Sequence, residues 1–172
     1  MLQEQSAKEI EQANESLEAA RSQNLGEQYL TFFMNEEEFG VSILSVQEIR
    51  GWEDVTPIPN APKQVKGVMN LRGTVVPVID LRVCFGLERI EYSEETVVII
   101  LAVPSGKGST KTMGVVVDAV SDVHNFDDAS VQPSPELSHA GQAQYIRGLG
   151  STDDQMVILL NLTDQLIEEI TH

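Results

Sequence analysis

Short hydrophobic runs with strand-like alternation begin after the first 28 residues. Residues 29–34 are aromatic and apolar, residues 35–38 are polar, and residues 39–43 alternate apolar side chains with small or polar ones. Side chains on a half-buried strand alternate between core and solvent, so these runs predict a β-hairpin. Residues 97–103 and 113–120 flank a glycine-containing turn and predict another hairpin.

Two further segments extend the strand pattern. Residues 67–81 form two apolar runs around the polar turn Asn70-Leu71-Arg72-Gly73. Pro77 in the second run has no N–H for a neighbouring strand, which predicts a sheet edge or a bulge. Residues 156–162 form an apolar run typical of a strand buried on both faces. Many short strands with turns between them predict an all-β protein with a small antiparallel barrel in each half.

The same frame occurs twice along the chain. The matched positions are Gly40 and Gly114, Val46 and Val120, Gly67 and Gly148, and Leu81 and Leu162. In each copy the first two positions are six residues apart and the last two are fourteen apart. This spacing predicts an internal duplication with core repeats of approximately residues 29–85 and 96–162. A unit of about 60 residues buries little surface alone, so we expect the two copies to share a core.

The two copies differ most at one turn. Asn70-Leu71-Arg72-Gly73 in the first copy corresponds to Ser151-Thr152-Asp153-Asp154 in the second, whereas the other matched positions are mostly apolar or glycine. Shared apolar positions indicate scaffold, and a turn that differs is a better candidate for function. A turn containing Asn70 and Gly73 would hold the Arg72 guanidinium in one direction, which favours a binding role over that of an ordinary solvated residue.

The ends of the chain differ from the strand-rich region. Residues 1–28 are acidic and have few large apolar side chains, although Ile10, Ala13, Leu17 and Ala20 form a weak helical stripe. We expect a disordered or weakly helical acidic tail there rather than a docked helix. After Thr163, a short C-terminal helix is predicted.

Composition excludes several classes of function. The 172 residues include 27 acidic and 11 basic ones, a formal charge of −16, which would repel the phosphates of nucleic acids and anionic lipid headgroups. No apolar run reaches the roughly 20 residues of a membrane span, and the acidic N-terminus does not look like a secretion signal. We therefore expect a cytoplasmic protein without direct membrane insertion. Cys84 is the only cysteine, so no internal disulfide can form.

Candidate catalytic groups are few. His124, His139 and His172 are far apart in sequence, and no Cys/His metal-binding spacing, nucleophile elbow or phosphate-binding loop is present. No cofactor or metal is expected. An alternative is a small-ligand-binding or hydrolytic β-barrel that uses carboxylates in apolar strands. Its candidate residues are Asp80, Asp118 and Asp122, although such residues more often fix turns or strand ends.

The longer motifs resemble the CheW family of chemotaxis coupling proteins. The resemblance is carried by residues 45–50, by Pro57 to Pro62, and by Gly67-Val68-Met69-Asn70-Leu71-Arg72-Gly73 through residues 75–82. In the second half it is carried by residues 114–123 and by Ile146-Arg147-Gly148-Leu149-Gly150. The similarity spans residues 29–170, which implies a domain of residues 29–172 made of two SH3-like five-stranded β-barrels with a shared core.

The resemblance implies a non-enzymatic adaptor at chemoreceptor arrays. It would couple the cytoplasmic tip of methyl-accepting chemotaxis receptors to the regulatory domain of the chemotaxis histidine kinase. The residues implied to face the receptor are Val46, Glu48, Gly67, Asn70, Arg72, Gly73 and Val97. Those implied to face the kinase are Val75, Val131 and Leu137. A further possibility is a ring-forming filler that contacts other copies of itself.

Overall fold

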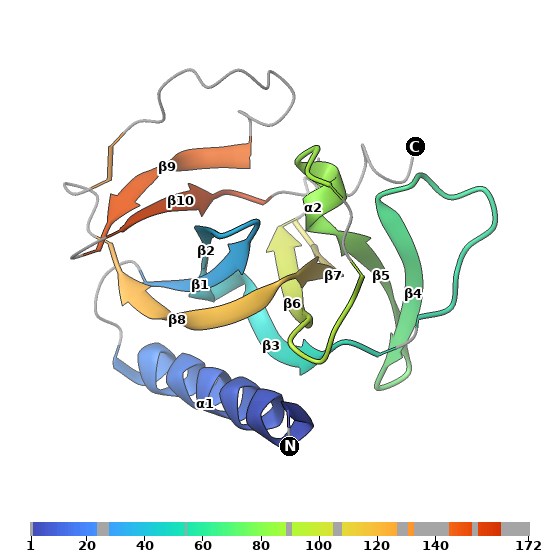
Figure 1. The fold of residues 1–172 in the computed structure, drawn as a ribbon, viewed down its shortest axis with the longest axis horizontal. Helices are drawn as coiled ribbons and strands as arrows, with labels where there is room; N and C mark the ends of the chain where they lie inside the picture. The colour runs from blue at the N-terminus through green and yellow to red at the C-terminus, as the bar shows by residue number, and fades with distance from the viewer. Residues whose placement is uncertain are drawn as a thin grey trace.

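The strands in the described part of the chain form two five-stranded sheets (Figure 1). The computed structural model describes residues 2–23, 28–53, 55–88, 91–104, 108–126, 131–132, 145–152 and 155–162, with residues 2–6 and 21–23 as backbone only. The helices are α1 (Leu2–Gln23), the 3₁₀ turn η1 (Ile43–Ser45) and α2 (Leu81–Cys84). The strands are β1 (Gln28–Met34), β2 (Glu37–Ser42), β3 (Val46–Gly51), β4 (Val65–Leu71), β5 (Thr74–Asp80), β6 (Val97–Pro104), β7 (Thr110–Val117), β8 (Ala119–Asn125), β9 (Ile146–Ser151) and β10 (Met156–Leu160).

Each sheet takes strands from both halves of the chain. One sheet has the order β8-β1-β2-β10-β9 and the other β3-β6-β7-β5-β4. The expectation of two five-stranded units with a shared core is confirmed, but the prediction of one barrel within each half is wrong. The barrels are also not purely antiparallel, because β10 runs parallel to β2 and β5 runs parallel to β7. Strand exchange of this kind links the two halves through backbone hydrogen bonds as well as through the core.

The internal duplication is visible in this topology. Replacing each strand of the first sheet by the strand five places away in sequence order reproduces the order of the second sheet. The matched glycines have matched roles. A Cβ on Gly40 would lie 3.1 Å from the Leu159 side chain, and one on Gly114 would lie 2.9 Å from Val98. Both glycines thus allow close approach where a strand of one half meets its neighbours.

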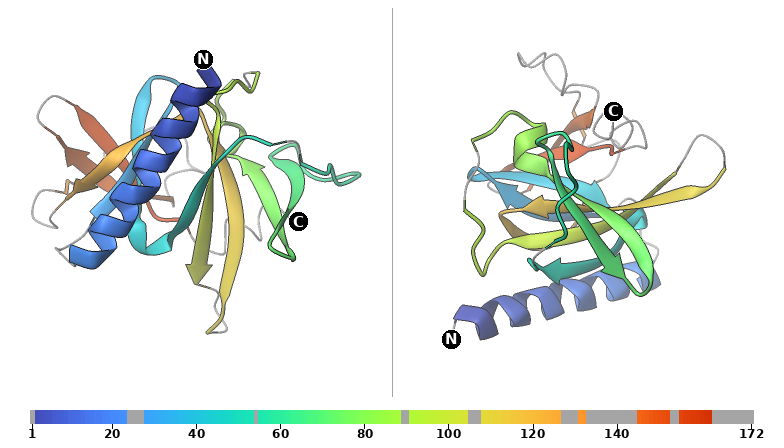
Figure 2. Two further views of the ribbon diagram at one scale, coloured as in Figure 1. Left: turned by 90° about the horizontal axis from the view of Figure 1, so that it is seen from below. Right: turned by 90° about the vertical axis from the view of Figure 1, so that its right-hand side faces the viewer.

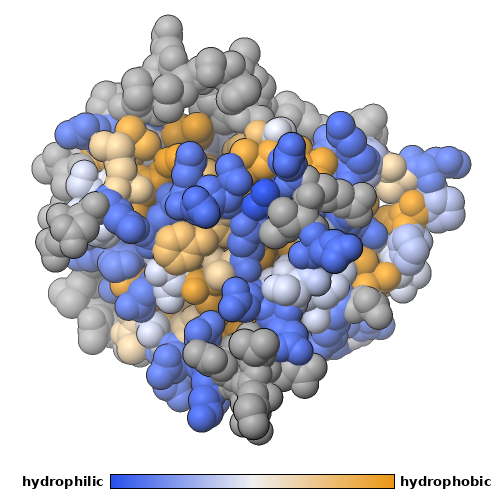
Figure 3. All heavy atoms as spheres, in the orientation of Figure 1, coloured by the Kyte–Doolittle hydropathy of each residue, from blue (hydrophilic) through white to orange (hydrophobic). Residues whose placement is uncertain are grey.

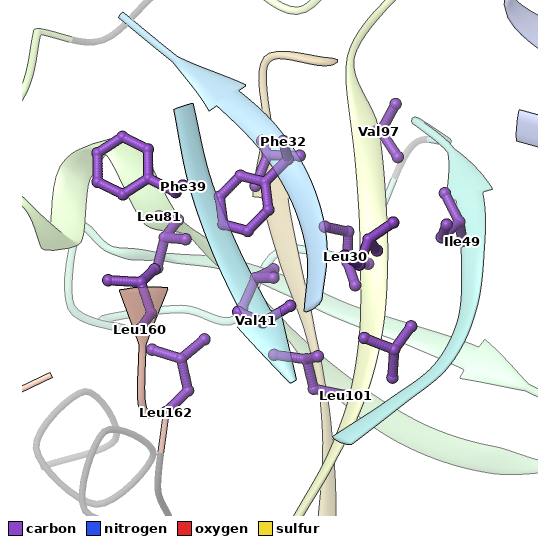
Figure 4. Close-up of a cluster of buried hydrophobic side chains, with 14 of the residues drawn as sticks. Leu30, Phe32, Phe39, Val41, Ile49, Leu81, Val97, Leu101, Leu160 and Leu162 are labelled. Carbon is purple, nitrogen blue, oxygen red and sulfur yellow. The ribbon is translucent and has the colours of Figure 1, made fainter. Parts of the chain in front are cut away.

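The largest core cluster lies between the two sheets. It combines buried side chains from the first sheet with side chains from the second (Figure 4). Those labelled in the figure are Leu30, Phe32, Phe39, Val41, Ile49, Leu81, Val97, Leu101, Leu160 and Leu162. Smaller clusters lie on the opposite faces, around Val98 and Ile100 in one sheet and around Tyr29 and Leu159 in the other. Several strands are therefore buried on both faces, which explains their long apolar runs.

Helix α1 differs from the expected disordered or weakly helical tail. It is a 22-residue helix that packs against β8, β3 and η1, and it buries Ala13, Leu17 and Ala20 (Figure 2). Sequence reasoning identified this stripe but underestimated it, because two of its members are alanines with little apolar surface. Full burial of a leucine contributes roughly 1.5–3 kcal/mol, so one leucine and two alanines hold this long helix by a modest free energy.

Some predicted boundaries also differ. The apolar run of residues 113–120 is divided at Asp118, because β7 belongs to one sheet and β8 to the other. Pro77 lies in a strand with neighbours on both sides, but β5 pairs with β7 only from Val78 onward. The segment that contains Pro77 therefore pairs with β4 alone, which accommodates the missing N–H. The predicted C-terminal helix after Thr163 lies outside the described residues.

Candidate partner-binding surface

The tip of the β4–β5 hairpin is a two-residue turn formed by Arg72 and Gly73. Their φ angles are 52° and 88°, so both residues have left-handed backbone conformations. A two-residue turn of this kind matches the right-handed twist of the strands that it connects. The Asn70 side-chain oxygen accepts a hydrogen bond from the Gly73 N–H at 2.7 Å. Arginine in this conformation costs roughly 1–2 kcal/mol relative to ordinary backbone. The turn thus presents an arginine in a fixed direction although glycine would fit there with less strain.

Arg72 forms an ion pair with Glu48 of β3. The Arg72 Nη2 atom lies 3.2 Å from Glu48 Oε2, and the side chains are 77% and 23% exposed, respectively. Strands β3 and β4 are at opposite edges of their sheet, so the pair joins two edges that are brought together as the sheet curves into a barrel. An ion pair this exposed contributes little to stability, typically about 0–1 kcal/mol. Its main effect is to orient both charged groups.

The charge cluster around Glu48 is incompletely satisfied. Arg50 Nη1 lies 3.7 Å from Glu48 Oε1, and Arg50 Nη2 lies 3.7 Å from Glu53 Oε1. The buried atoms Glu48 Oε1 and Arg50 Nε have no hydrogen-bond partner within the described part of the chain. Unpaired buried polar atoms are costly, and they occur where a partner or a bound molecule can complete them. We name the cluster of Glu48, Arg50 and Arg72 the β3–hairpin charge cluster.

Gly67 shapes the backbone next to this cluster. Its φ is 149°, and a Cβ there would lie 2.2 Å from the Thr56 carbonyl oxygen. Thr56 pairs with Val68 through two backbone hydrogen bonds of 2.9 Å, so the segment after β3 lies directly alongside the edge strand β4. A small pocket of about 130 Å³ lies beside this backbone contact. Its lining includes Gly51, Glu53, Thr56, Met69 and Asn70.

Two of the predicted receptor-facing residues are in the core. Val46 and Val97 are buried and belong to the cluster between the sheets, at opposite ends of the β3–β6 pair. Their side chains therefore hold strand positions and are not available to a partner in this conformation. Glu48, Asn70, Arg72 and Gly73 do lie together, because β3 and the β4–β5 hairpin meet at the Arg72 side chain.

The predicted kinase-facing residues lie on different sheets. Val75 is 64% exposed and pairs with Asn70 on the β4–β5 hairpin, close to Arg72. Val131 is partly buried against the cluster around Phe126, next to Gln132, which pairs with Leu149 of β9. Leu137 lies outside the described residues. The structure therefore brings Val75 close to the predicted receptor-facing residues, and it does not bring Val131 there.

Sequence reasoning did not single out Leu44, Ile58 or Met156, which are exposed apolar residues. Met156 is 55% exposed at the start of β10, the counterpart of Val75 at the start of β5. Extending the duplicated frame backward from Leu81 and Leu162 pairs these two residues, so the signal was present in the sequence. On the face shown in Figure 3, hydrophobic residues form scattered patches among hydrophilic ones. Val75 and Met156 are thus equivalent exposed apolar residues on the β4–β5 and β9–β10 hairpins.

The carboxylates of the enzymatic alternative are engaged in structural contacts. Asp80 accepts hydrogen bonds from the Arg82 N–H at 3.0 Å and from the Tyr92 hydroxyl at 2.6 Å. Asp118 pairs with Arg82 at 2.6 Å and accepts from the Asn35 N–H at 2.9 Å. Asp122 is exposed and accepts a bond from the next residue's N–H at 2.8 Å. Asp80 and Asp118 thus fix an element end and a turn, as the structural alternative predicted, whereas Asp122 lies within β8 and its carboxylate makes a local contact.

Other candidate chemistry is weak in the parts of the chain that the structure covers. Within the described ranges, no group of three or more His, Cys, Asp or Glu side chains could hold a metal ion. Burial raises the pKa of the Cys84 thiol to about 12, with a further contribution from the nearby Asp80 charge, so the thiol is a poor nucleophile at neutral pH. Among the same residues, no helix has the length and hydrophobicity of a membrane span.

Comparisons with known proteins agree with this architecture. The CheW-like domain family model matches residues 28–169. Chemotaxis protein CheW of Klebsiella aerogenes is 42% identical over 147 residues, covering 86% of each chain. Chemotaxis protein CheW of Rhizobium meliloti is 36% identical over 139 residues, 81% of this chain and 86% of the relative. The crystal structure of the scaffolding protein TtCheW from Thermoanaerobacter tengcongensis has a TM-score of 0.71 and 31% identity, and the match covers 81% and 92% of the two chains. The chain therefore belongs to the CheW-like family.

Proposed function

We propose that this chain is a chemotaxis adaptor that couples methyl-accepting chemoreceptors to the chemotaxis histidine kinase and supports assembly of the receptor array. The observation that carries the proposal is membership in the CheW-like family, whose solved relative is a scaffolding protein, together with a preorganised charge cluster at the tip of the β4–β5 hairpin. The protein acts by binding and not as an enzyme. It would work in the cytoplasm, at the inner side of receptor-containing membranes.

The receptor would bind at the β3–hairpin charge cluster. Arg72 is exposed on a turn that fixes its direction, and a preorganised guanidinium loses less entropy when it forms paired hydrogen bonds. The exposed Arg72 guanidinium and the partly exposed Glu48 carboxylate offer a donor and an acceptor at the same place. A receptor segment with a complementary donor and carboxylate would bind both groups. Val46 and Val97 would contribute indirectly, by fixing the strands from the core.

The kinase would bind at barrel surfaces that include Val75 and the region of Val131 to Leu137. Val75 and Arg72 share one hairpin, so contacts to the two partners would be only a few residues apart. A ligand shifts a conformational equilibrium only if its contacts differ in free energy between the two states. A short, hydrogen-bonded hairpin could transmit such a conformational change, because a movement of the Arg72 turn would also move Val75 on the adjoining strand. Contacts with other copies in rings would use similar surfaces.

The test is a titration with a receptor cytoplasmic fragment, in which NMR chemical-shift changes of the backbone amides report binding. We predict that Arg72→Ala weakens binding by about tenfold or more, because truncation of a central arginine commonly costs over 1 kcal/mol. Its free energy of unfolding should change by less than about 0.5 kcal/mol. Glu36→Ala is the matched control, since Glu36 is an exposed charged residue with φ of 67° on another hairpin tip. Equal binding of Arg72→Ala and wild type would refute the assignment of this site.

A further inference from the structure

Helix α1 lies outside the part of the chain that the family model matches, residues 28–169. It packs against both β3 and β8, each of which is an edge strand of its sheet (Figure 2). These strands are counterparts in the duplication, so α1 covers two equivalent edges. An uncovered edge strand presents unpaired backbone groups that can accept another protein segment.

The Asn14 side chain pairs with the backbone of β3 as a neighbouring strand would. Its Nδ2 donates to the Ile49 carbonyl oxygen at 3.1 Å, and its Oδ1 accepts from the Ile49 N–H at 3.1 Å. Ile49 lies between Glu48 and Arg50, two members of the β3–hairpin charge cluster. Helix α1 therefore occupies the outer edge of the same strand that carries the proposed receptor contacts.

The fit of α1 to these edges is incomplete. Its buried stripe is narrow, with Leu17 as the one large side chain that is fully covered in the described part of the helix. A groove of about 790 Å³ remains between α1 and β8, and Gln12, Ser16, Phe33 and Val120 are among its lining residues. The helix wall of this groove carries the exposed acids Glu9 and Glu15, whereas Glu11 is exposed and does not line the groove. The contacts hold α1 in place without filling the space beneath it.

We propose that α1 is a built-in competitor at a helix-binding surface formed by the β3 and β8 edges. The incoming partner would be an amphipathic helix with a narrow apolar stripe and a side-chain amide able to pair with Ile49, and it would displace α1. The proposal rests on the proposed function, because the receptor is the partner to which we assign this helix. Occupation by α1 lowers the apparent affinity of the partner by the fraction of molecules in which the surface is free.

The experiment uses the full chain in four forms: wild type, Asn14→Ala, Leu17→Glu and the outer-face control Glu11→Gln. Amide hydrogen exchange in α1 and at Ile49 is measured with and without a receptor cytoplasmic fragment. In wild type, α1 exchange should rise when the fragment binds. Asn14→Ala and Leu17→Glu should bind the fragment about three- to tenfold more tightly than wild type, and Glu11→Gln should match wild type. Bound fragment with unchanged α1 exchange, or equal affinities in all forms, would overturn the proposal.

A second probe separates this proposal from the proposed function. A labelled peptide copy of residues 2–23 should bind Asn14→Ala and Leu17→Glu more tightly than wild type, because α1 is loosened in both. If the receptor fragment binds none of the four forms, the proposed function fails, and the peptide still decides whether the surface accepts a helix. Equal peptide binding by wild type and both loosened variants would reject the helix-binding surface. Two variants are used because Asn14→Ala perturbs packing less than Leu17→Glu does.

Discussion

Arg82 and Asp118 form the most deeply placed ion pair described in the structure. Arg82 is 6% exposed, and its Nη1 lies 2.6 Å from Asp118 Oδ2. Arg82 also donates through Nε to the Glu88 carbonyl oxygen at 2.8 Å. Asp118 lies between β7 and β8, at the point where the chain passes from one sheet to the other. The pair therefore ties α2 to the connection between the barrels, a structural role at a position that the sequence also allowed to be catalytic.

Asp118→Ala tests this role at the level of one residue. Removing one partner of a buried pair leaves an uncompensated charge, so we predict a loss of roughly 3 kcal/mol in the free energy of unfolding. Asp122→Ala is the control, because Asp122 is exposed, and it should cost less than about 1 kcal/mol. Urea denaturation of both variants measures the difference. Similar costs for the two substitutions would contradict the structural role of the pair.

Single residues also show what sequence could and could not reveal. Glu48 and Arg72 were both named from the motif, but 24 positions separate them, and nothing in the sequence says that their side chains meet. Their contact depends on the curvature that brings opposite edges of a sheet together. Val46 and Val97 show a second limit of sequence reasoning. A family resemblance cannot distinguish a residue that contacts a partner from a buried residue that supports the binding surface.

Hairpins were the elements that sequence predicted best. Strand alternation and turn residues are local, and the β1–β2, β4–β5 and β6–β7 pairs all form as expected. The packing of α1 was not foreseen, because the hydrophobicity of alanine is too low to mark a buried face clearly. The β4–β5 hairpin is the element that matters most for the proposed site. It contains two glycines with positive φ, of which Gly67 is closely packed against Thr56 and Gly73 is not.

Alanine substitutions at Gly73 and Gly67 distinguish the cost of a left-handed backbone from the cost of a steric clash. A Cβ on Gly73 meets nothing within 4 Å, so Gly73→Ala should cost only the roughly 1–2 kcal/mol of a left-handed backbone. A Cβ on Gly67 would collide with Thr56 backbone atoms at 2.2 and 2.7 Å, so Gly67→Ala should cost more, about 3 kcal/mol or above. Thermal unfolding of the two variants gives the comparison. A Gly67→Ala protein as stable as Gly73→Ala would show that the Thr56 backbone does not lie as close to Gly67 as described.

At the scale of the whole molecule, the duplication explains both the success and the error of sequence reasoning. The repeat correctly indicated two related units with a shared core. It could not show which strands pair, because β1–β5 and β6–β10 are built on the same pattern and either half could in principle complete a barrel. The long-range register that selects the exchanged arrangement becomes visible only in the sheet order.

Exchange of strands between halves predicts a single folding unit. If the chain were divided between the repeats, neither half would contain all the strands of either sheet. For example, β6 and β7 of the second half lie between β3 and β5 of the first. We therefore predict one cooperative thermal transition, with equal calorimetric and van't Hoff enthalpies. Fragments of residues 1–95 and 96–172 should each be unfolded alone. Two separate transitions, or a stably folded fragment, would contradict the shared architecture.

The most direct test of the adaptor function is reconstitution of kinase control. Receptor-containing membranes and the histidine kinase are combined with wild type, Arg72→Ala or Glu36→Ala, and kinase activity and co-sedimentation are measured together. Wild type and Glu36→Ala should place the kinase under receptor control equally, whereas Arg72→Ala should leave activity close to the level without adaptor. The same receptor-controlled activity without this chain, or full activity with Arg72→Ala, would contradict the account.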